Sequence, residues 1–161
     1  MTVSVQMFGG EAAEILSEMQ ARSFQDTPEQ LWSGKEFAAL FQHSGTKAMI
    51  LSVAAETAGF LMWRQVADEA EILTIAVLPA CRGRGLGQRL LEEFYEQARV
   101  AGVRDIFLEV RADNKAAESL YAKAGFDRVG RRKNYYGGRG AEKQDALIMK
   151  YSLDPHSACK I

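Results

Sequence analysis

The segment 82–87, with the sequence RGRGLG, constrains this chain more than any other feature of its sequence. It follows a run rich in β-branched residues at 71–77 and precedes a stretch with an apolar helical stripe, so it joins a strand to a helix. Its glycines let the backbone adopt positive φ and approach a ligand closely. The following helix points free N–H groups and the positive end of its dipole at the turn. With Arg82 and Arg84 as further donors, the segment predicts a cradle for a pyrophosphate.

Two common nucleotide-binding motifs do not fit this turn. A Walker P-loop requires Lys and then Ser or Thr after its last glycine, whereas Gln88 and Arg89 follow Gly87. The dinucleotide fingerprint G-x-G-x-x-G requires a glycine where Gln88 stands. A glycine-rich turn that joins strand to helix without binding a ligand is the alternative that these residues leave open.

The hydrophobic pattern along the chain predicts an α/β fold with a mixed sheet flanked by helices. Helices are expected over 11–24, from Ser33 through Phe41, from the glycine turn to Gly102, and from Asn114 to Gly125. Two of these helices have a recognisable start. Ser33 and Glu36 have the spacing of a capping box, and Asn114 has the side chain of an N-cap. Strands are expected at 2–7, 48–55, 59–66, 71–77, 104–111, 126–132 and 145–153, with hairpin turns at 56–58 and 133–140. The order β-α-α-β-β-β-α-β-α-β-β mixes hairpins with crossovers in one sheet.

Length and composition set the broad class of the protein. The 161 residues fit one domain, and the 47% hydrophobic content is ordinary for a globular chain with a core. A net charge of −1 argues against direct binding to nucleic acid, which needs a strongly basic face. No stretch resembles a signal peptide or a membrane span, and Cys81 and Cys159 have no partner spacing, which predicts reduced thiols in a cytoplasmic protein without a metal site.

The glycine turn and five further segments resemble a known family. Arg82-x-x-Gly85-x-Gly87 matches the [Q/R]-x-x-G-x-[G/A] turn of the GNAT N-acetyltransferases, which bind the pyrophosphate of acetyl-CoA there. The segments ILTIAV, LEVR, LYAKAGF, RKNYY and DALIM continue the resemblance at residues 72–77, 108–111, 120–126, 132–136 and 145–149. LEVR, KNYY and DALIM together resemble the RimI group, which are bacterial ribosomal-protein alanine N-acetyltransferases.

The resemblance implies a single-domain GNAT fold over residues 1–153, followed by a flexible tail at 154–161. It implies acetyl-CoA as cosubstrate, bound between the strands 71–77 and 104–111, and no metal. The residues that match the family's acetyl-CoA site are Ile75, Ala76, Val77, Arg82, Gly83, Arg84, Gly85, Leu86, Gly87, Asn114 and Tyr121. For Asn114, a role as helix N-cap is an equally good interpretation, and the two roles are compatible.

Glu109 is the candidate general base. It lies in mid-strand on the face opposite Ile106, Leu108 and Val110, where a carboxylate can also be a simple surface group paired with Arg104 or Arg111. The match of the LEVR segment to the family implies instead that Glu109 accepts the proton of the acceptor amine, directly or through water.

Tyr121 is the candidate general acid. Its helical spacing with Ala117 and Ala124 is also typical of an aromatic residue that covers the core. The family's L-Y-x-x-x-G-F segment implies that its hydroxyl lies near the thioester sulfur, where a phenol with a pKa of about 10 can donate a proton to the departing thiolate.

Three aromatic residues are candidates for the acceptor side of the site. Trp32 is either a core residue or part of a peptide-binding wall. Tyr135 and Tyr136 follow the basic run 131–133, which is an RNA-binding pattern in other contexts. The net charge favours a substrate-binding or solvated loop here.

The resemblance therefore implies transfer of an acetyl group to a protein N-terminus, namely the N-terminal alanine of the eighteenth small-subunit ribosomal protein. Acetylation of a small amine such as a polyamine or an aminoglycoside is an alternative, favoured by an acidic floor built from Asp68, Glu69 and Glu71. Acetylation of lysine side chains and a non-catalytic acyl-CoA-binding regulator are further alternatives. A monomer and a dimer are both compatible with the sequence.

Overall fold

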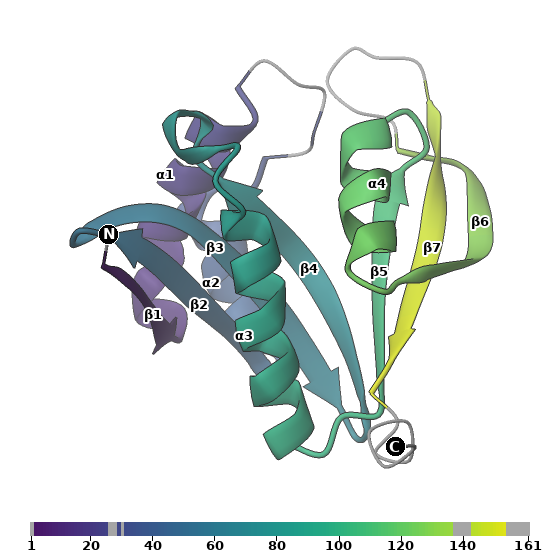
Figure 1. Cartoon of the computed structure of the whole chain (residues 1–161), viewed down its shortest axis with the longest axis horizontal. Coiled ribbons are helices and arrows are strands. Elements are labelled where there is room, and N and C mark those ends of the chain that lie inside the picture. The colour runs from purple at the N-terminus through teal and green to yellow at the C-terminus, as the bar shows by residue number, and fades with distance from the viewer. Residues whose placement is uncertain (1, 26–28, 30, 137–142, 154–161) are drawn as a thin grey trace.

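The computed structural model describes residues 2–25, 29, 31–136 and 143–153 of the chain. These residues form one seven-stranded sheet in the order β1-β2-β3-β4-β5-β7-β6 (Figure 1). All neighbouring strands pair antiparallel except β4 and β5, which are parallel. The strands are β1 (Val3–Phe8), β2 (Thr46–Val53), β3 (Glu56–Val66), β4 (Glu69–Val77), β5 (Asp105–Arg111), β6 (Asp127–Tyr136) and β7 (Gln144–Ser152).

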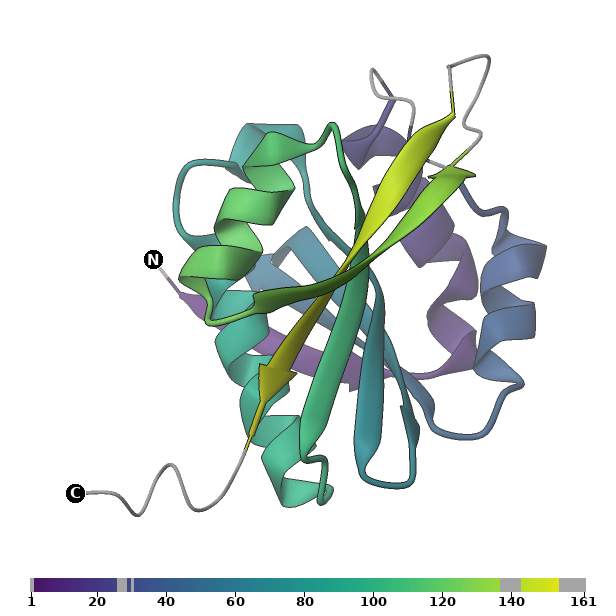
Figure 2. The ribbon, with the colours of Figure 1, turned by 90° about the vertical axis from the view of Figure 1, so that its right-hand side faces the viewer.

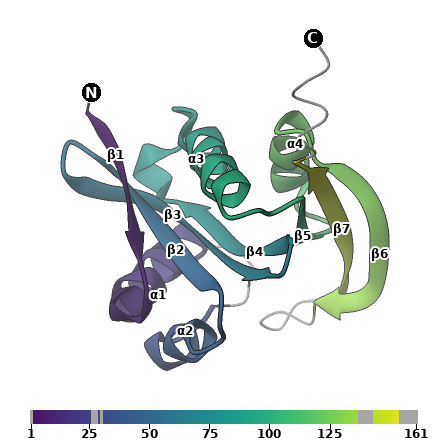
Figure 3. The same cartoon turned by 90° about the horizontal axis from the view of Figure 1, so that it is seen from below.

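Helices cover both faces of the sheet. Helices α1 (Ala13–Ser23) and α2 (Gly34–Phe41) lie on one face, and α3 (Leu86–Val100) and α4 (Lys115–Lys123) lie on the other (Figure 3). Each pair of helices closes a separate apolar core against the sheet, because successive strand residues point to opposite faces. Phe60 and Met62 of β3 face α1 and α2, whereas Leu61 and Trp63 face α3.

The predicted α/β fold, its element order and its helix-start signals are confirmed. Ser33 and Glu36 form a reciprocal capping box at α2, and the Asn114 side chain accepts a hydrogen bond from the Ala117 N–H at α4. Among the described residues, no helix has the length and apolar character needed to cross a membrane. The predicted tail at 154–161 lies outside the described residues.

Two predicted turns are wrong in position. The β2–β3 turn consists of Ala54 and Ala55, both at positive φ, and Glu56 and Thr57 already belong to β3. The prediction failed because two-residue turns of this kind favour Asn or Gly, and alanine gives no such signal. Strand β6 also continues to Tyr136, four residues beyond its predicted end, because a bulge lets it keep pairing with β7.

The contact between β4 and β5 is short. Parallel pairing joins Glu69–Glu71 to Asp105–Phe107 and stops there. Beyond that point β4 pairs only with β3, and β5 pairs only with β7, so the carboxyl ends of the two strands diverge (Figure 1). One extra residue of β4, Leu73, forms a bulge opposite β3 where the divergence begins. A bulge bends and twists its strand, which gives a physical reason for the opening.

We expect Phe94→Ala to lower the free energy of unfolding by about 3 to 5 kcal/mol, because it empties a fully buried site. The Phe94 ring lies 5.0 Å from that of Trp63 and 6.2 Å from that of Tyr95, centroid to centroid. Val100→Ala on the same helix is the control, since Val100 is 86% exposed and its loss should change the free energy by less than about 0.5 kcal/mol. Urea denaturation of both variants measures the difference; equal midpoints would contradict this account of the core.

Candidate active site

The glycine turn lies at the carboxyl end of β4 and leads directly into α3. Gly83 and Gly85 have φ of +79° and +74°, and an added Cβ at either position would meet no atom within 4 Å. The space beside both glycines is therefore open, and they are needed for the left-handed backbone. Gly85 is the N-cap of α3 and no side chain caps the helix, so the first N–H groups of α3 are available to a ligand. This backbone arrangement is the one that an anion cradle requires, and binding of a pyrophosphate there stays a prediction.

The side chain of Arg82 turns toward the protein. Its Nε donates to the carbonyl oxygen of Val77 at 3.0 Å, and its Nη2 donates to that of Ser23 at 2.6 Å. Ser23 is the last residue of α1, so this guanidinium joins the glycine turn to the end of a helix on the other face of the sheet. Arg84 is exposed, as an arginine available to a phosphate would be.

The residues predicted to contact the cofactor arm line the opening between β4 and β5. Ile75, Ala76 and Val77 lie in the part of β4 that pairs with β3 but not with β5. Backbone groups of β4 that point toward β5 are consequently outside the parallel ladder and can bind amide groups of an extended ligand. Parallel strands commonly bind ligands where their carboxyl ends separate, and both the turn and α4 are placed there.

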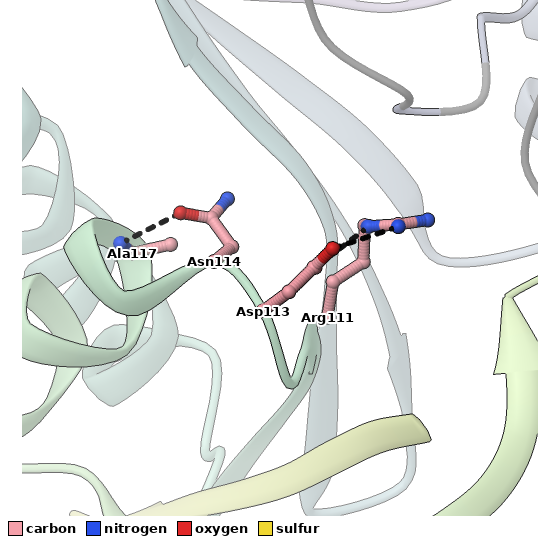
Figure 4. Close-up of polar contacts among 4 residues, drawn as sticks. All are labelled: Arg111, Asp113, Asn114 and Ala117. Atoms are coloured by element: carbon pink, nitrogen blue, oxygen red, sulfur yellow. Dashed lines mark hydrogen bonds and ion pairs between the residues drawn. The ribbon is translucent and has the colours of Figure 1, made fainter. Parts of the chain in front are cut away.

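The turn between β5 and α4 carries a compact polar network (Figure 4). The buried Arg111 guanidinium donates from Nε and Nη2 to the two carboxylate oxygens of Asp113, both at 3.1 Å. Arg111 therefore lowers the pKa of Asp113. The Asn114 Oδ1 accepts from the Ala117 N–H at 3.1 Å, while burial raises the pKa of Glu29, which also interacts with Asn114 through a side-chain hydrogen bond. Asn114 is thus an N-cap in this structure, and its contact with the cofactor stays a prediction.

Tyr121 lies on the buried face of α4, packed against Phe126 with ring centroids 5.9 Å apart. The end of its helix is fixed from α3, because the Tyr95 hydroxyl donates to the carbonyl oxygen of Ala124 at 3.0 Å. The Tyr95 ring also stacks on Tyr151 of β7 at 4.5 Å. These contacts hold α4, and with it Tyr121, at a defined place beside the opening.

Glu109 lies on the opposite side of β5 from the core with α3, as the alternation of the strand predicts. Its carboxylate is 18% exposed and lies 3.1 Å from Nε of Arg132 on β6. A pairing with Arg104 or Arg111 was the sequence-based alternative, and this ion pair with Arg132 is the one formed. Burial raises the pKa of Glu109, Arg132 opposes that rise, and Glu71 adds to it. A carboxylate with a raised pKa is a better proton acceptor at neutral pH.

A cavity of about 320 Å³ opens beside Glu109 on this face of the sheet. Both apolar side chains, including Phe107 and Ile148, and charged side chains line it. Glu69 and Glu71 line it together with Arg64, which pairs with Glu71 at 3.7 Å. Asp68, the third acidic residue of the predicted floor, is not among the residues that line this cavity.

The bulge in β6 determines where Arg132 and Tyr135 lie. Five residues of β6, from Arg132 to Tyr136, pass opposite three of β7, from Ala146 to Gln144, and Asn134 adopts a positive φ of 54°. Asp145 of β7 holds this bulge, because its carboxylate accepts from the Asn134 N–H at 2.8 Å and pairs with Arg131. These interactions lower the pKa of Asp145. The Tyr135 ring is half exposed, with the Arg132 guanidinium 5.1 Å from its centroid.

The other two residues predicted on the acceptor side are Trp32 and Tyr136. Trp32 is half-buried, and its ring packs edge-to-face on Phe37 with centroids 5.4 Å apart. Tyr136 pairs with Gln144 at the end of β6. The structure does not bring Trp32 into the cavity beside Glu109, so its role in substrate binding stays a prediction.

Sequence reasoning missed several residues that shape the site. It placed Arg132 only in a basic run and gave Asp145 no partner, and it considered Arg111 as a partner of Glu109 but not of Asp113. Strand β7 lies between β5 and β6 (Figure 2). Local spacing therefore gives no signal for the ion pair that joins Arg132 of β6 to Glu109 of β5. The bidentate pair of Arg111 and Asp113 is only two residues apart and was detectable in principle.

Residues 13–126 match the family model of the acetyltransferase (GNAT) family. The [ribosomal protein bS18]-alanine N-acetyltransferase of Salmonella typhimurium is 40% identical over 121 residues, which cover 73% of this chain and 78% of that protein. The enzyme of the same description from Escherichia coli K12 is 37% identical over 120 residues, with the same two coverages. The chain therefore belongs to the GNAT acetyltransferase family, and it is an N-acetyltransferase.

Solved structures agree with this membership. The crystal structure of the ribosomal-protein-S18-alanine N-acetyltransferase from E. coli superposes with a TM-score of 0.84 at 30% identity, covering 94% of both chains. An acetyltransferase from Salmonella typhimurium with its cofactor acetyl-CoA has the same fold, with a TM-score of 0.78 at 18% identity over 98% of this chain and 97% of that one. Acetyltransferases of this fold use acetyl-CoA, and the open glycine turn and the divergent strands described above fit that molecule.

We expect Gly85→Ala to lower the free energy of unfolding by about 1 to 2 kcal/mol, because an alanine is strained at this left-handed position. Gly87→Ala is the matched control. Its added Cβ would lie 3.5 Å from Leu120, an ordinary contact, and Gly87 belongs to α3, where alanine favours the helix. Chemical denaturation of the two variants compares them. A Gly85→Ala protein as stable as the Gly87→Ala protein would contradict the need for glycine at this position.

Proposed function

We propose that this protein transfers the acetyl group of acetyl-CoA to the N-terminal alanine of ribosomal protein bS18. The observation that carries the proposal is the half-buried Glu109 carboxylate, which lies beside a cavity on the face opposite α3 and α4. The similarity to enzymes named for bS18 alanine acetylation, at 37 to 40% identity over 73% of this chain, supports the choice of acceptor.

On the cofactor side, Gly83, Gly85 and the first N–H groups of α3 would bind the pyrophosphate, with Arg84 as a charged donor. The β4 backbone from Ile75 to Val77 and the Asn114 amide would hold the amide-bearing arm. When bound, acetyl-CoA supplies the acetyl group as a thioester. The end of the parallel ladder at Glu71 and Phe107 supports this proposal, because it leaves the backbone of Ile75–Val77 outside the pairing with β5.

On the acceptor side, Glu109 takes a proton from the incoming ammonium group and leaves the amine free to attack. Burial raises the pKa of Glu109, which improves its basicity, while Arg132 opposes that rise. Tyr121 would hold the proton that the departing thiolate needs. A buried phenol on a fixed helix keeps its proton at neutral pH and can donate it at a defined point.

The energetics of deprotonation favour an N-terminal acceptor over a lysine. An α-amino group has a pKa near 8, so freeing it at pH 7.5 costs under about 1 kcal/mol. A lysine with a pKa near 10.4 costs about 4 kcal/mol. A single carboxylate base such as Glu109 is sufficient to deprotonate an α-amino group and poorly matched to a lysine.

A small cationic amine is the second candidate acceptor, because the cavity beside Glu109 is also lined by Glu69 and Glu71. Arg64 and Arg132 line the same cavity and pair with Glu71 and Glu109, respectively, which balances much of that negative charge. A polyamine would meet fewer unpaired carboxylates than the count of acidic residues implies. The peptide acceptor is therefore the function that this arrangement supports best.

The acceptor is tested by measuring CoA release with acetyl-CoA and each of three acceptors, which are two short peptides and spermidine. One peptide begins with a free alanine, and the other is N-blocked and contains one lysine. We expect turnover on the free-alanine peptide alone, since its amine needs the smaller proton-transfer cost. Turnover confined to the lysine peptide would discard the N-terminal acceptor, and turnover confined to spermidine would favour the small-amine alternative.

Glu109→Gln should lower kcat by a factor of about 10² to 10⁴, because it removes the proton acceptor and retains the shape of the side chain. Acetyl-CoA binding, measured by calorimetry, should change little. Glu96→Gln, which removes an exposed carboxylate of α3, is the control and should retain full activity. A Glu109→Gln enzyme with normal kcat, or one that no longer binds acetyl-CoA, would contradict the assignment of Glu109 as the base.

A further inference from the structure

We propose that Arg132 is a positioning residue that holds the Glu109 carboxylate in place and in its ionised form, ready to accept the acceptor's proton. This inference rests on the function proposed above, and it adds a residue of β6 to the site. Arg132 acts through Glu109 and is not assigned a contact with either substrate.

Two contacts fix the guanidinium of Arg132. Its Nε lies 3.1 Å from Oε1 of Glu109, which is an ion-pair distance. The ring of Tyr135 lies 5.1 Å from its central carbon, within the range of a cation–π interaction. Arg132 is 54% exposed, whereas Glu109 is 18% exposed, so the arginine reaches from the surface onto a more deeply placed carboxylate.

The backbone of β6 is shaped to make this contact. The bulge between Arg132 and Tyr136 displaces the strand from regular pairing with β7, and bulges of this kind re-aim side chains near active sites. Asp145 holds the bulge through the Asn134 N–H and through Arg131. The two arginines of this basic run therefore have different partners. Arg131 pairs with Asp145 at the bulge, and Arg132 pairs with Glu109.

The charges around Glu109 show what Arg132 contributes. Glu69 and Glu71 of β4 and Arg64 of β3 line the same cavity, and Arg64 pairs with Glu71. Burial and Glu71 both raise the pKa of Glu109, and Arg132 is the opposing influence. Without Arg132, the two raising influences act unopposed and the carboxylate takes up its proton at a higher pH. A base must be ionised to act, so activity is present above the pKa of Glu109 and is lost as the pH falls through it.

The test is the pH dependence of kcat/KM for Arg132→Gln between pH 5 and pH 9, with the free-alanine peptide as acceptor. Dividing the kcat/KM of the variant by that of the wild type at each pH removes the effect of the acceptor's own ionisation. We expect a ratio near one above pH 8 that falls to roughly one tenth at low pH, which corresponds to an upward shift of about one pH unit. Arg132→Lys keeps the positive charge and should restore most of the activity at low pH.

Arg128→Gln is the matched control, because Arg128 is an exposed arginine of the same strand that does not line the cavity. Its ratio to wild type should stay near one at every pH. A ratio for Arg132→Gln that is reduced equally at all pH values would overturn the proposal, since a purely structural role predicts that result. Failure of Arg132→Lys to restore activity at low pH would also count against it.

A second measurement separates this inference from the proposed function. Carbon-13 NMR of labelled glutamate carboxyls, with Glu109 assigned by its absence in Glu109→Gln, follows the ionisation of Glu109 without any acceptor. An unchanged Glu109 titration in Arg132→Gln refutes the role of Arg132 whatever the substrate is. A shifted titration, together with wild-type protein that is inactive on the alanine peptide, keeps the role of Arg132 and rejects the proposed acceptor.

Discussion

The early end of parallel pairing between β4 and β5 is the constraint on which the rest of the site depends. After three residue pairs, each strand continues with a different neighbour, and the Leu73 bulge turns β4 away from β5. The carboxyl ends of both strands therefore separate and carry the glycine turn and the Arg111–Asn114 turn apart. A sheet that paired regularly to the end of β4 would leave no backbone groups free for a ligand.

The opening at the glycine turn and the cavity beside Glu109 have different electrostatic character. Toward α3 and α4, the turn presents backbone N–H groups and a helix N-terminus, which suit an anion. On the other face, carboxylates line the cavity and arginines from β3 and β6 balance them.

The sequence was sufficient to predict the features that depend on local chemistry. Ser33 and Glu36 are three residues apart and form the capping box, and the alternation of β5 places Glu109 away from the core with α3. Contacts between distant segments were not predictable in this way. Arg132 meets Glu109 across β7, so the contact depends on strand order and on a bulge that no short motif encodes.

Arg82 shows a second limit of prediction from sequence motifs. Its type and position predicted a phosphate donor, but its Nε and Nη2 donate to the carbonyl oxygens of Val77 and Ser23. A motif identifies which residue types occur at a site, whereas the direction of a long flexible side chain depends on the acceptors that the fold brings within reach. The backbone part of the motif, with Gly83 and Gly85 at positive φ, agreed with expectation because it depends only on the residues themselves.

The turn of Ala54 and Ala55 affects the order in which the sheet assembles. Each alanine at positive φ costs about 1 to 2 kcal/mol, so this hairpin is disfavoured as an isolated segment. The residue that precedes β1 contributes to holding this turn, since the Ala54 N–H donates to the carbonyl oxygen of Thr2 at 2.9 Å. The strands β2 and β3 are consecutive in the chain, yet their pairing gains its stability from β1 and from the two cores. This half of the sheet should therefore form cooperatively with its helices rather than grow from a preformed hairpin.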